Sequence, residues 1–130
     1  MKIYHISQIE KLYHSSLESD LTSFLAYSHF GNLDQAEGKA GILLSESRMI
    51  DAETIPTIYI VMVTTNNSKR VKDVGDNAWG LEIRKAEREG FDSIIYENEY
   101  EGEGMSYIIF DSSDVTIIDK FFYSGEGWRY

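Results

Sequence analysis

Two short apolar runs, residues 93–96 and 107–110, flank an acidic segment that contains glycines. Both runs consist mainly of β-branched and aromatic residues and are too short for a typical helix, which predicts two buried strands. Glutamates occupy alternate positions between and beside the runs: Glu97, Glu99, Glu101 and Glu103. Carboxylates at this spacing repel one another, so the segment is either a solvated turn or the acidic edge of a functional site.

The size and composition predict one globular domain spanning residues 1–130, with enough apolar residues for a core. The absence of cysteine excludes disulfides and thiolate chemistry. The longest apolar run, residues 58–63, is too short to cross a membrane, and the first residues do not form the apolar centre of a signal peptide. We therefore expect a cytoplasmic protein without membrane partners.

The net charge of −10 disfavours direct nucleic-acid binding, because an acidic surface repels phosphates. The acidity either maintains solubility or allows docking on a basic surface, including that of a nucleic-acid-binding protein. Metal binding is not expected, because His5, His14 and His29 lack the spacing of a ligand set. The sequence also contains no nucleophile elbow and no glycine-rich phosphate-binding loop.

The remaining pattern predicts an α+β fold with two principal helices, because strands and helices do not alternate regularly. Asn32 and Gln35 form a capping box for the first helix, and residues 45–56 are expected to be a loop. Asp76 or Asn77 caps the second helix, and Gly90 ends it. Residues 7–10 also fit a capping box and a helical turn, and residues 66–70 a polar turn. The expected strands cover residues 1–6, 12–14, 27–31, 57–64, 93–96, 107–110 and 115–122.

Several short motifs occur in a fixed order along residues 12–118. Residues 12–16 read Leu-Tyr-His-Ser-Ser, and residues 28–31 read Ser-His-Phe-Gly, followed by Gln35-Ala36. Residues 90–96 read Gly-Phe-Asp-Ser-Ile-Ile-Tyr, then Asn98-Glu-Tyr-Glu-Gly, and residues 106–111 read Ser-Tyr-Ile-Ile-Phe-Asp. In this order and spacing the chain resembles the ADP-ribosyltransferase fold, and most of all the small branch found in phage polyvalent proteins and mobile elements.

The resemblance implies a pair of split antiparallel sheets with NAD, the substrate, bound in a cleft between them. His14 matches the histidine that bonds the ribose on the nicotinamide side, and Ser15 the position whose backbone holds the carboxamide. The second-strand motif would line the nicotinamide pocket with Tyr27, His29 and Phe30. His5 lies in a similar string and is a weaker candidate for the first motif.

The catalytic carboxylate departs from the family pattern. In the poly-ADP-ribosylating branch of the fold a glutamate immediately precedes the last strand of the motif set, and here that position is Ser106. The carboxylate would then come from the acidic segment, with Glu101 as the first choice and Glu99 as the second. Ser15 also replaces a glycine that allows close approach of the backbone to the amide.

Three functions remain open at this point. The first is an ADP-ribosyltransferase that cleaves NAD and modifies a protein or nucleic-acid target, which the histidines and the two glutamates favour. The second is a catalytically inactive member of the same fold that binds a partner protein through its acidic surface, for example as a phage-encoded inhibitor, which Ser15 and Ser106 favour. The third is a module that only binds NAD or ADP-ribose.

Overall fold

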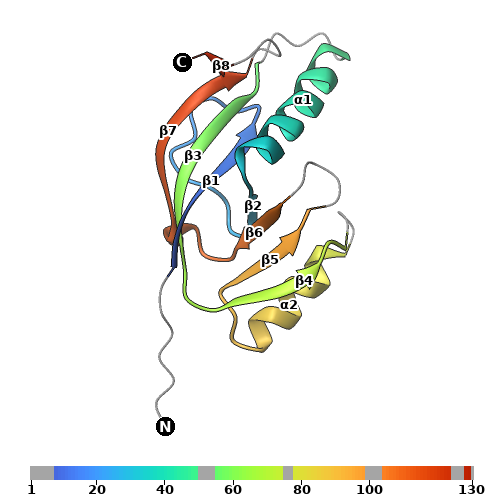
Figure 1. Cartoon of the computed structure of the whole chain (residues 1–130), viewed down its shortest axis with the longest axis vertical. Helices are drawn as coiled ribbons and strands as arrows, with labels where there is room; N and C mark the ends of the chain where they lie inside the picture. Colours follow the sequence, from blue (N-terminus) through green and yellow to red (C-terminus); the bar gives the residue numbers. More distant parts are fainter. Residues whose placement is uncertain (1–7, 50–54, 75–77, 99–103, 124–127, 130) are drawn as a thin grey trace.

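The computed structural model describes residues 8–49, 55–74, 78–98, 104–123 and 128–129, and in this part the chain is a mixed α+β structure with two sheets (Figure 1). The first sheet has the order β1-β3-β7-β8, with β1 Gln8–Ser16, β3 Thr57–Thr65, β7 Val115–Tyr123 and β8 Trp128–Arg129. The second has the order β2-β6-β5-β4, with β2 Ser28–Phe30, β6 Met105–Ile109, β5 Ser93–Glu97 and β4 Ser68–Lys72. Its helices are α1 Leu33–Met49, α2 Trp79–Arg88 and the short 3-10 helix η1 Ser112–Asp114.

The two sheets are joined at one edge of each. β1 is an edge strand of the first sheet, and it meets the residue that follows β2, an edge strand of the second. Tyr13 of β1 and Gly31, directly after β2, exchange two backbone hydrogen bonds of 2.8 and 3.0 Å. All other strand pairs are antiparallel except β4 with β5. The expected α+β class is therefore present, as two sheets of mostly antiparallel strands with one parallel pair that the sequence did not indicate.

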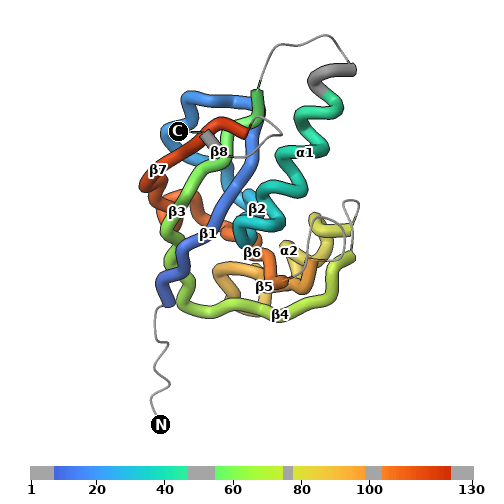
Figure 2. Tube along the Cα trace, turned by 45° about the horizontal axis from the view of Figure 1, so that its top comes forward, coloured from blue at the N-terminus to red at the C-terminus, as the bar shows by residue number. Residues whose placement is uncertain are grey.

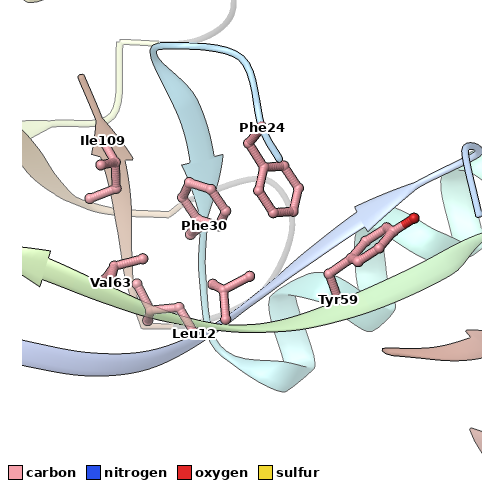
Figure 3. Close-up of a cluster of buried hydrophobic side chains, with 7 residues drawn as sticks. Leu12, Phe24, Phe30, Tyr59, Val63 and Ile109 are labelled. Carbon is pink, nitrogen blue, oxygen red and sulfur yellow. The ribbon is translucent and has the colours of Figure 1, made fainter. Parts of the chain in front are cut away.

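Three apolar clusters hold the layers together. The first lies between the sheets (Figure 3) and contains Leu12, Phe24, Phe30, Tyr59, Val61, Val63 and Ile109. In the second, α1 packs Ala36 and Ala40 onto sheet one, where the small side chains allow a close approach to β3. In the third, α2 packs Trp79 and Ala86 onto sheet two. Both views place α1 beside sheet one and α2 beside sheet two (Figures 1 and 2).

Several predicted elements are confirmed. Strand β3 is central in its sheet, as its continuous apolar sequence indicated. The helix stop at Gly90 is also correct: its φ is +88°, Gly90 N–H donates to Glu87 O and Phe91 N–H donates to Ala86 O, which is a Schellman motif. Strand β8, which the sequence did not predict, pairs with β7. The expected strand at residues 1–6 lies outside the described residues, as do Asp76 and Asn77. The N-cap position of α2 is Ala78, without a side-chain hydrogen bond, so the prediction that Asp76 or Asn77 is the cap is wrong.

Other predicted elements are wrong. Residues 8–10 belong to β1 rather than to a helical turn, because pairing with residues 63–65 of β3 outweighs the local capping pattern. Helix α1 continues to Met49, so residues 45–49 are not a loop. Each glycine inside that helix costs about 1 kcal/mol relative to alanine, but packing of α1 onto sheet one compensates for this loss. Residues 68–70 are part of the edge strand β4, whose polar side chains resembled a turn.

None of the helices in the described part of the chain combines the length and the apolar character that crossing a membrane would need.

Candidate functional site

A concave region of about 400 Å³, part of it open solvent, lies where the joined edges of the two sheets meet the start of α1. Its lining comes from three separate parts of the sequence: Tyr13, His14, Ser15, His29, Phe30, Gly31, Gln35, Ala36, Lys39, Tyr96, Asn98 and Ser106. The bridge between Tyr13 and Gly31 explains the position, because it brings the end of β1 and the end of β2 together beside the helix. We refer to this region as the joint pocket.

His14 is held in one orientation by its neighbours. Its Nδ1 lies 2.5 Å from the backbone oxygen of His29, and its ring contacts Phe24 and Phe30 at centroid distances of 4.8 and 5.3 Å. Because a carbonyl oxygen only accepts hydrogen bonds, Nδ1 carries the hydrogen. Burial lowers the pKa of His14 below its usual 6.5, which the hydrogen bond to His29 opposes and the charge of Lys39 reinforces. At neutral pH the ring is therefore uncharged, and Nε2 is its hydrogen-bond acceptor.

His29 faces the opposite side of sheet two, toward α2. Its Nδ1 lies 2.8 Å from the hydroxyl of Tyr96, and its ring makes edge contacts with Tyr96 and Trp79, each at 5.7 Å between centroids. Tyr96 and Trp79 are themselves 4.5 Å apart. We refer to these three rings as the aromatic wall. His29 and Tyr96 line the joint pocket, and the buried Trp79 holds both of them in place.

Gln35 is the centre of a polar network that also lines the joint pocket. Its Oε1 accepts from Asn32 N–H and from the Ser106 hydroxyl, both at 2.9 Å, and its Nε2 donates to Gly104 O at 2.9 Å. The Ser106 hydroxyl in turn accepts from Asn98 Nδ2 at 3.1 Å. The backbone N–H of Asn98 also donates to Gly104 O at 2.9 Å. This bond continues the pairing of β5 with β6 at the end next to residues 99–103. The capping box expected for α1 is therefore confirmed, and it extends into sheet two.

The structure brings together four of the five residues predicted to bind the cofactor: His14, Ser15, His29 and Phe30. Ser15 is buried and its hydroxyl donates to Ala36 O at 2.5 Å, so its side chain is directed to α1. Phe30 is 2% exposed and contributes mainly to the core between the sheets. These two residues shape the wall, whereas the histidines supply polar ring atoms.

Tyr27, the fifth predicted residue, is not part of the joint pocket. It precedes β2 with a φ of +65°, its hydroxyl donates to Glu87 Oε2 at 2.9 Å, and its ring lies against Phe110. Glu87 also lines a larger hollow of about 850 Å³ with Arg84 and Arg88. The described residues that line this hollow all belong to α2, and Tyr27 contacts the same helix through its bond to Glu87.

The predicted catalytic residues Glu99 and Glu101 lie outside the described residues. Lys39 is the lining residue that sequence reasoning missed entirely; the signal that could have found it is its position one helical turn after Gln35. Gln35, Tyr96, Asn98 and Ser106 were recognised as parts of motifs, but only the position of Ser106 was linked to the site.

Comparisons with protein families, with curated proteins and with solved structures found no match.

Proposed function

We propose that this chain is an ADP-ribosyltransferase-like protein that binds NAD in the joint pocket and transfers ADP-ribose to a macromolecular target. The target best suited to its acidic surface is a basic or nucleic-acid-binding protein. One observation carries the proposal: His14, His29 and Asn98, from three motifs far apart in sequence, line a single concave region. These are the motifs on which the resemblance to ADP-ribosyltransferases rests, and nothing in their spacing along the chain requires them to meet.

In this proposal His14 orients the ribose next to the nicotinamide. Its Nδ1 hydrogen is used by His29 O, so the neutral ring offers Nε2 as an acceptor for a ribose hydroxyl. The lowered pKa matters here, because a protonated ring would offer a donor and would place a positive charge beside the reacting carbon. The aromatic wall of His29 and Tyr96 supplies the flat surface on which a nicotinamide ring stacks.

The reaction breaks the bond between the nicotinamide nitrogen and the ribose carbon. Nicotinamide leaves with the bonding electrons as a neutral molecule, and the ribose carbon becomes positively charged until a nucleophile of the target bonds to it and loses a proton. A carboxylate fixed nearby stabilises that positive charge in the transition state. We assign this role to Glu101, which Gly102 follows in the sequence, with Glu99 as the second choice.

A second candidate function is a catalytically inactive member of the fold that inhibits a partner protein by binding it through its acidic surface. The observation that favours it concerns the described lining of the joint pocket, which includes no carboxylate. Ser106, at the position of the usual glutamate, is 2% exposed and already bonded to Gln35 and Asn98. In this case the joint pocket has no catalytic role, and the acidic surface binds the partner protein.

The test combines binding with turnover. Trp79 contacts both His29 and Tyr96, so its fluorescence reports NAD entering the joint pocket, and Trp128→Phe removes the other tryptophan signal. Nicotinamide release is then measured with cell lysate as the source of acceptors. We expect Glu101→Gln to lower the rate by roughly 100-fold or more without changing NAD affinity, and the matched control Glu97→Gln to retain the wild-type rate.

Each result separates the candidates. Full activity of Glu101→Gln together with loss in Glu99→Gln would move the catalytic role to Glu99. Binding of NAD without nicotinamide release would favour the simple binding module. A wild-type protein that does not bind millimolar NAD is not an ADP-ribosyltransferase; capture of a host protein that survives His14→Ala but weakens at high salt would then support the inhibitor.

A further inference from the structure

Gln35 makes contacts that reach beyond the end of its own helix. It is 4% exposed, and its side-chain amide bonds to residues of two elements: Asn32, directly before α1, and Ser106 and Gly104 at the start of β6. A capping box needs only the bond to Asn32. The two further bonds connect α1 to the β5–β6 hairpin, which belongs to the other sheet.

Two glycines leave room for this connection. A Cβ on Gly31 would lie 2.1 Å from Gln35 Oε1, and a Cβ on Gly104 would lie 2.5 Å from Asn32 Nδ2 and 3.6 Å from Gln35 Nε2. Any larger residue at either position would collide with the amide groups. Glycine therefore occupies both backbone positions, 31 and 104, that the side-chain amides of Gln35 and Asn32 approach most closely.

We propose that Gln35 is a positioning residue that sets the width of the joint pocket. It fixes the wall formed by Tyr96, Asn98 and Ser106 relative to the wall formed by His14 and α1. The inference rests on the proposed function, because the pocket width matters for a ligand that touches both walls, as NAD would. Gln35 itself acts through Ser106 and Gly104, and the assigned catalytic carboxylates are other residues.

Two substitutions of Gln35 separate positioning from packing. Gln35→Met keeps a similar volume but loses all three side-chain hydrogen bonds, and we expect NAD affinity to fall by roughly tenfold or more. Gln35→Glu keeps the oxygen that accepts from Asn32 N–H and Ser106, but its carboxyl can donate to Gly104 O only when it is protonated. We expect it to bind as weakly as Gln35→Met at about pH 8 and to recover to within about threefold of wild type at about pH 5.5, because burial raises the pKa of the new carboxyl.

The wild type, titrated with NAD over the same pH range, gives the baseline. Its titratable pocket residues are Tyr13, His14, His29, Lys39 and Tyr96, which the variants share. Gln8→Glu, on the exposed start of β1, is the matched control and should bind NAD as the wild type does. Recovery of Gln35→Glu at low pH, absent in Gln35→Met, is the result that a general loss of packing does not produce.

Amide hydrogen exchange tests the connection without NAD. Asn98 N–H and Gln35 Nε2 share Gly104 O as their acceptor. Loss of the Gln35 bond therefore leaves Gly104 less firmly held and weakens its pairing with Asn98. We expect exchange of the Asn98 amide to accelerate roughly tenfold in Gln35→Met and Ser106→Ala, but not in Gln8→Glu. Unchanged exchange would overturn the inference even if the wild type binds NAD; accelerated exchange with unchanged NAD affinity would reduce Gln35 to a structural role. If the wild type does not bind NAD, the proposed function fails, and the exchange result alone decides whether the connection exists.

Discussion

Replacing Gly31 by alanine tests the Gln35 network from the backbone side. The new methyl group would lie 2.1 Å from Gln35 Oε1 and about 3 Å from two other atoms of the same side chain, so the amide must leave its place. The backbone itself does not oppose the change, because the φ of Gly31 is not in the left-handed region. The loss of unfolding free energy in Gly31→Ala therefore measures how much the Gln35 amide stabilises the fold in its present position.

The magnitude follows from the bonds that are lost. Displacing the amide removes its hydrogen bonds to Asn32, Ser106 and Gly104, each worth about 1 kcal/mol net. The restricted unfolded state of alanine relative to glycine returns up to about 1 kcal/mol. We expect the free energy of unfolding to fall by about 2–3 kcal/mol, which lowers the melting temperature by roughly 6–12 °C for a chain of this length.

Urea denaturation followed by circular dichroism measures this change, with Gly41→Ala as the control. A Cβ at Gly41 in α1 meets only Tyr123 Oη at an ordinary 3.8 Å, so that variant should gain up to about 1 kcal/mol from helix propensity. In a Gln35→Ala background the contacts to Oε1 and Cδ are absent and only the 3.2 Å contact to the Cβ of residue 35 remains, so Gly31→Ala should cost much less than in the wild type. An equal cost of Gly31→Ala in both backgrounds would refute the reasoning, because it would place the strain elsewhere than at Gln35.

Two further predictions concern Gly104 and His14. Gly104→Ala combines a φ of +116° with the contact to Asn32 and should cost about 2–3 kcal/mol, whereas Gly90→Ala, with a φ of +88° and open space, should cost about 1–2 kcal/mol; equal losses in urea denaturation would show that Asn32 moves aside freely. Because burial lowers the pKa of His14 in the folded state, the unfolded chain binds more protons once the pH falls below 6.5, and stability is lost from there down to the folded pKa. His14→Asn, whose amide can still donate to His29 O, should lack this loss, and identical pH dependence of the two proteins would contradict the lowered pKa.

The sequence predicted those features that depend on local chemistry. The capping box of Asn32 and Gln35, the stop at Gly90 and the apolar runs of β3, β5 and β7 each carry their signal within a few residues. The meeting of His14 with His29 was predictable only through the ordered motifs of a family resemblance. Neither periodicity nor composition indicates that β1 and β2 lie at adjoining sheet edges.

The features that the sequence did not predict depend on contacts between distant segments. Strand β4 has a polar sequence and forms because its backbone pairs in parallel with β5, on the edge of sheet two. Residues 8–10 carry a local helix signal that pairing with β3 overrides. Lys39 lies in the joint pocket only because α1 crosses the point where the sheets are joined. For β4 and for residues 8–10 the partner segment is more than 20 residues away in the sequence.

The network around Gln35 also explains why the strand position of Ser106 holds no carboxylate. Gln35 Oε1 already accepts from Asn32 N–H and faces residue 106, so a glutamate there would bring one acceptor against another. Turning the amide over would place Nε2 against Asn32 N–H and Oε1 against Gly104 O, which replaces two hydrogen bonds by two repulsions. The hydroxyl of Ser106 fits because it donates to Gln35 while accepting from Asn98. In the proposed ADP-ribosyltransferase, residue 106 therefore does not supply the catalytic carboxylate, which agrees with the proposal that Glu101 or Glu99 supplies it.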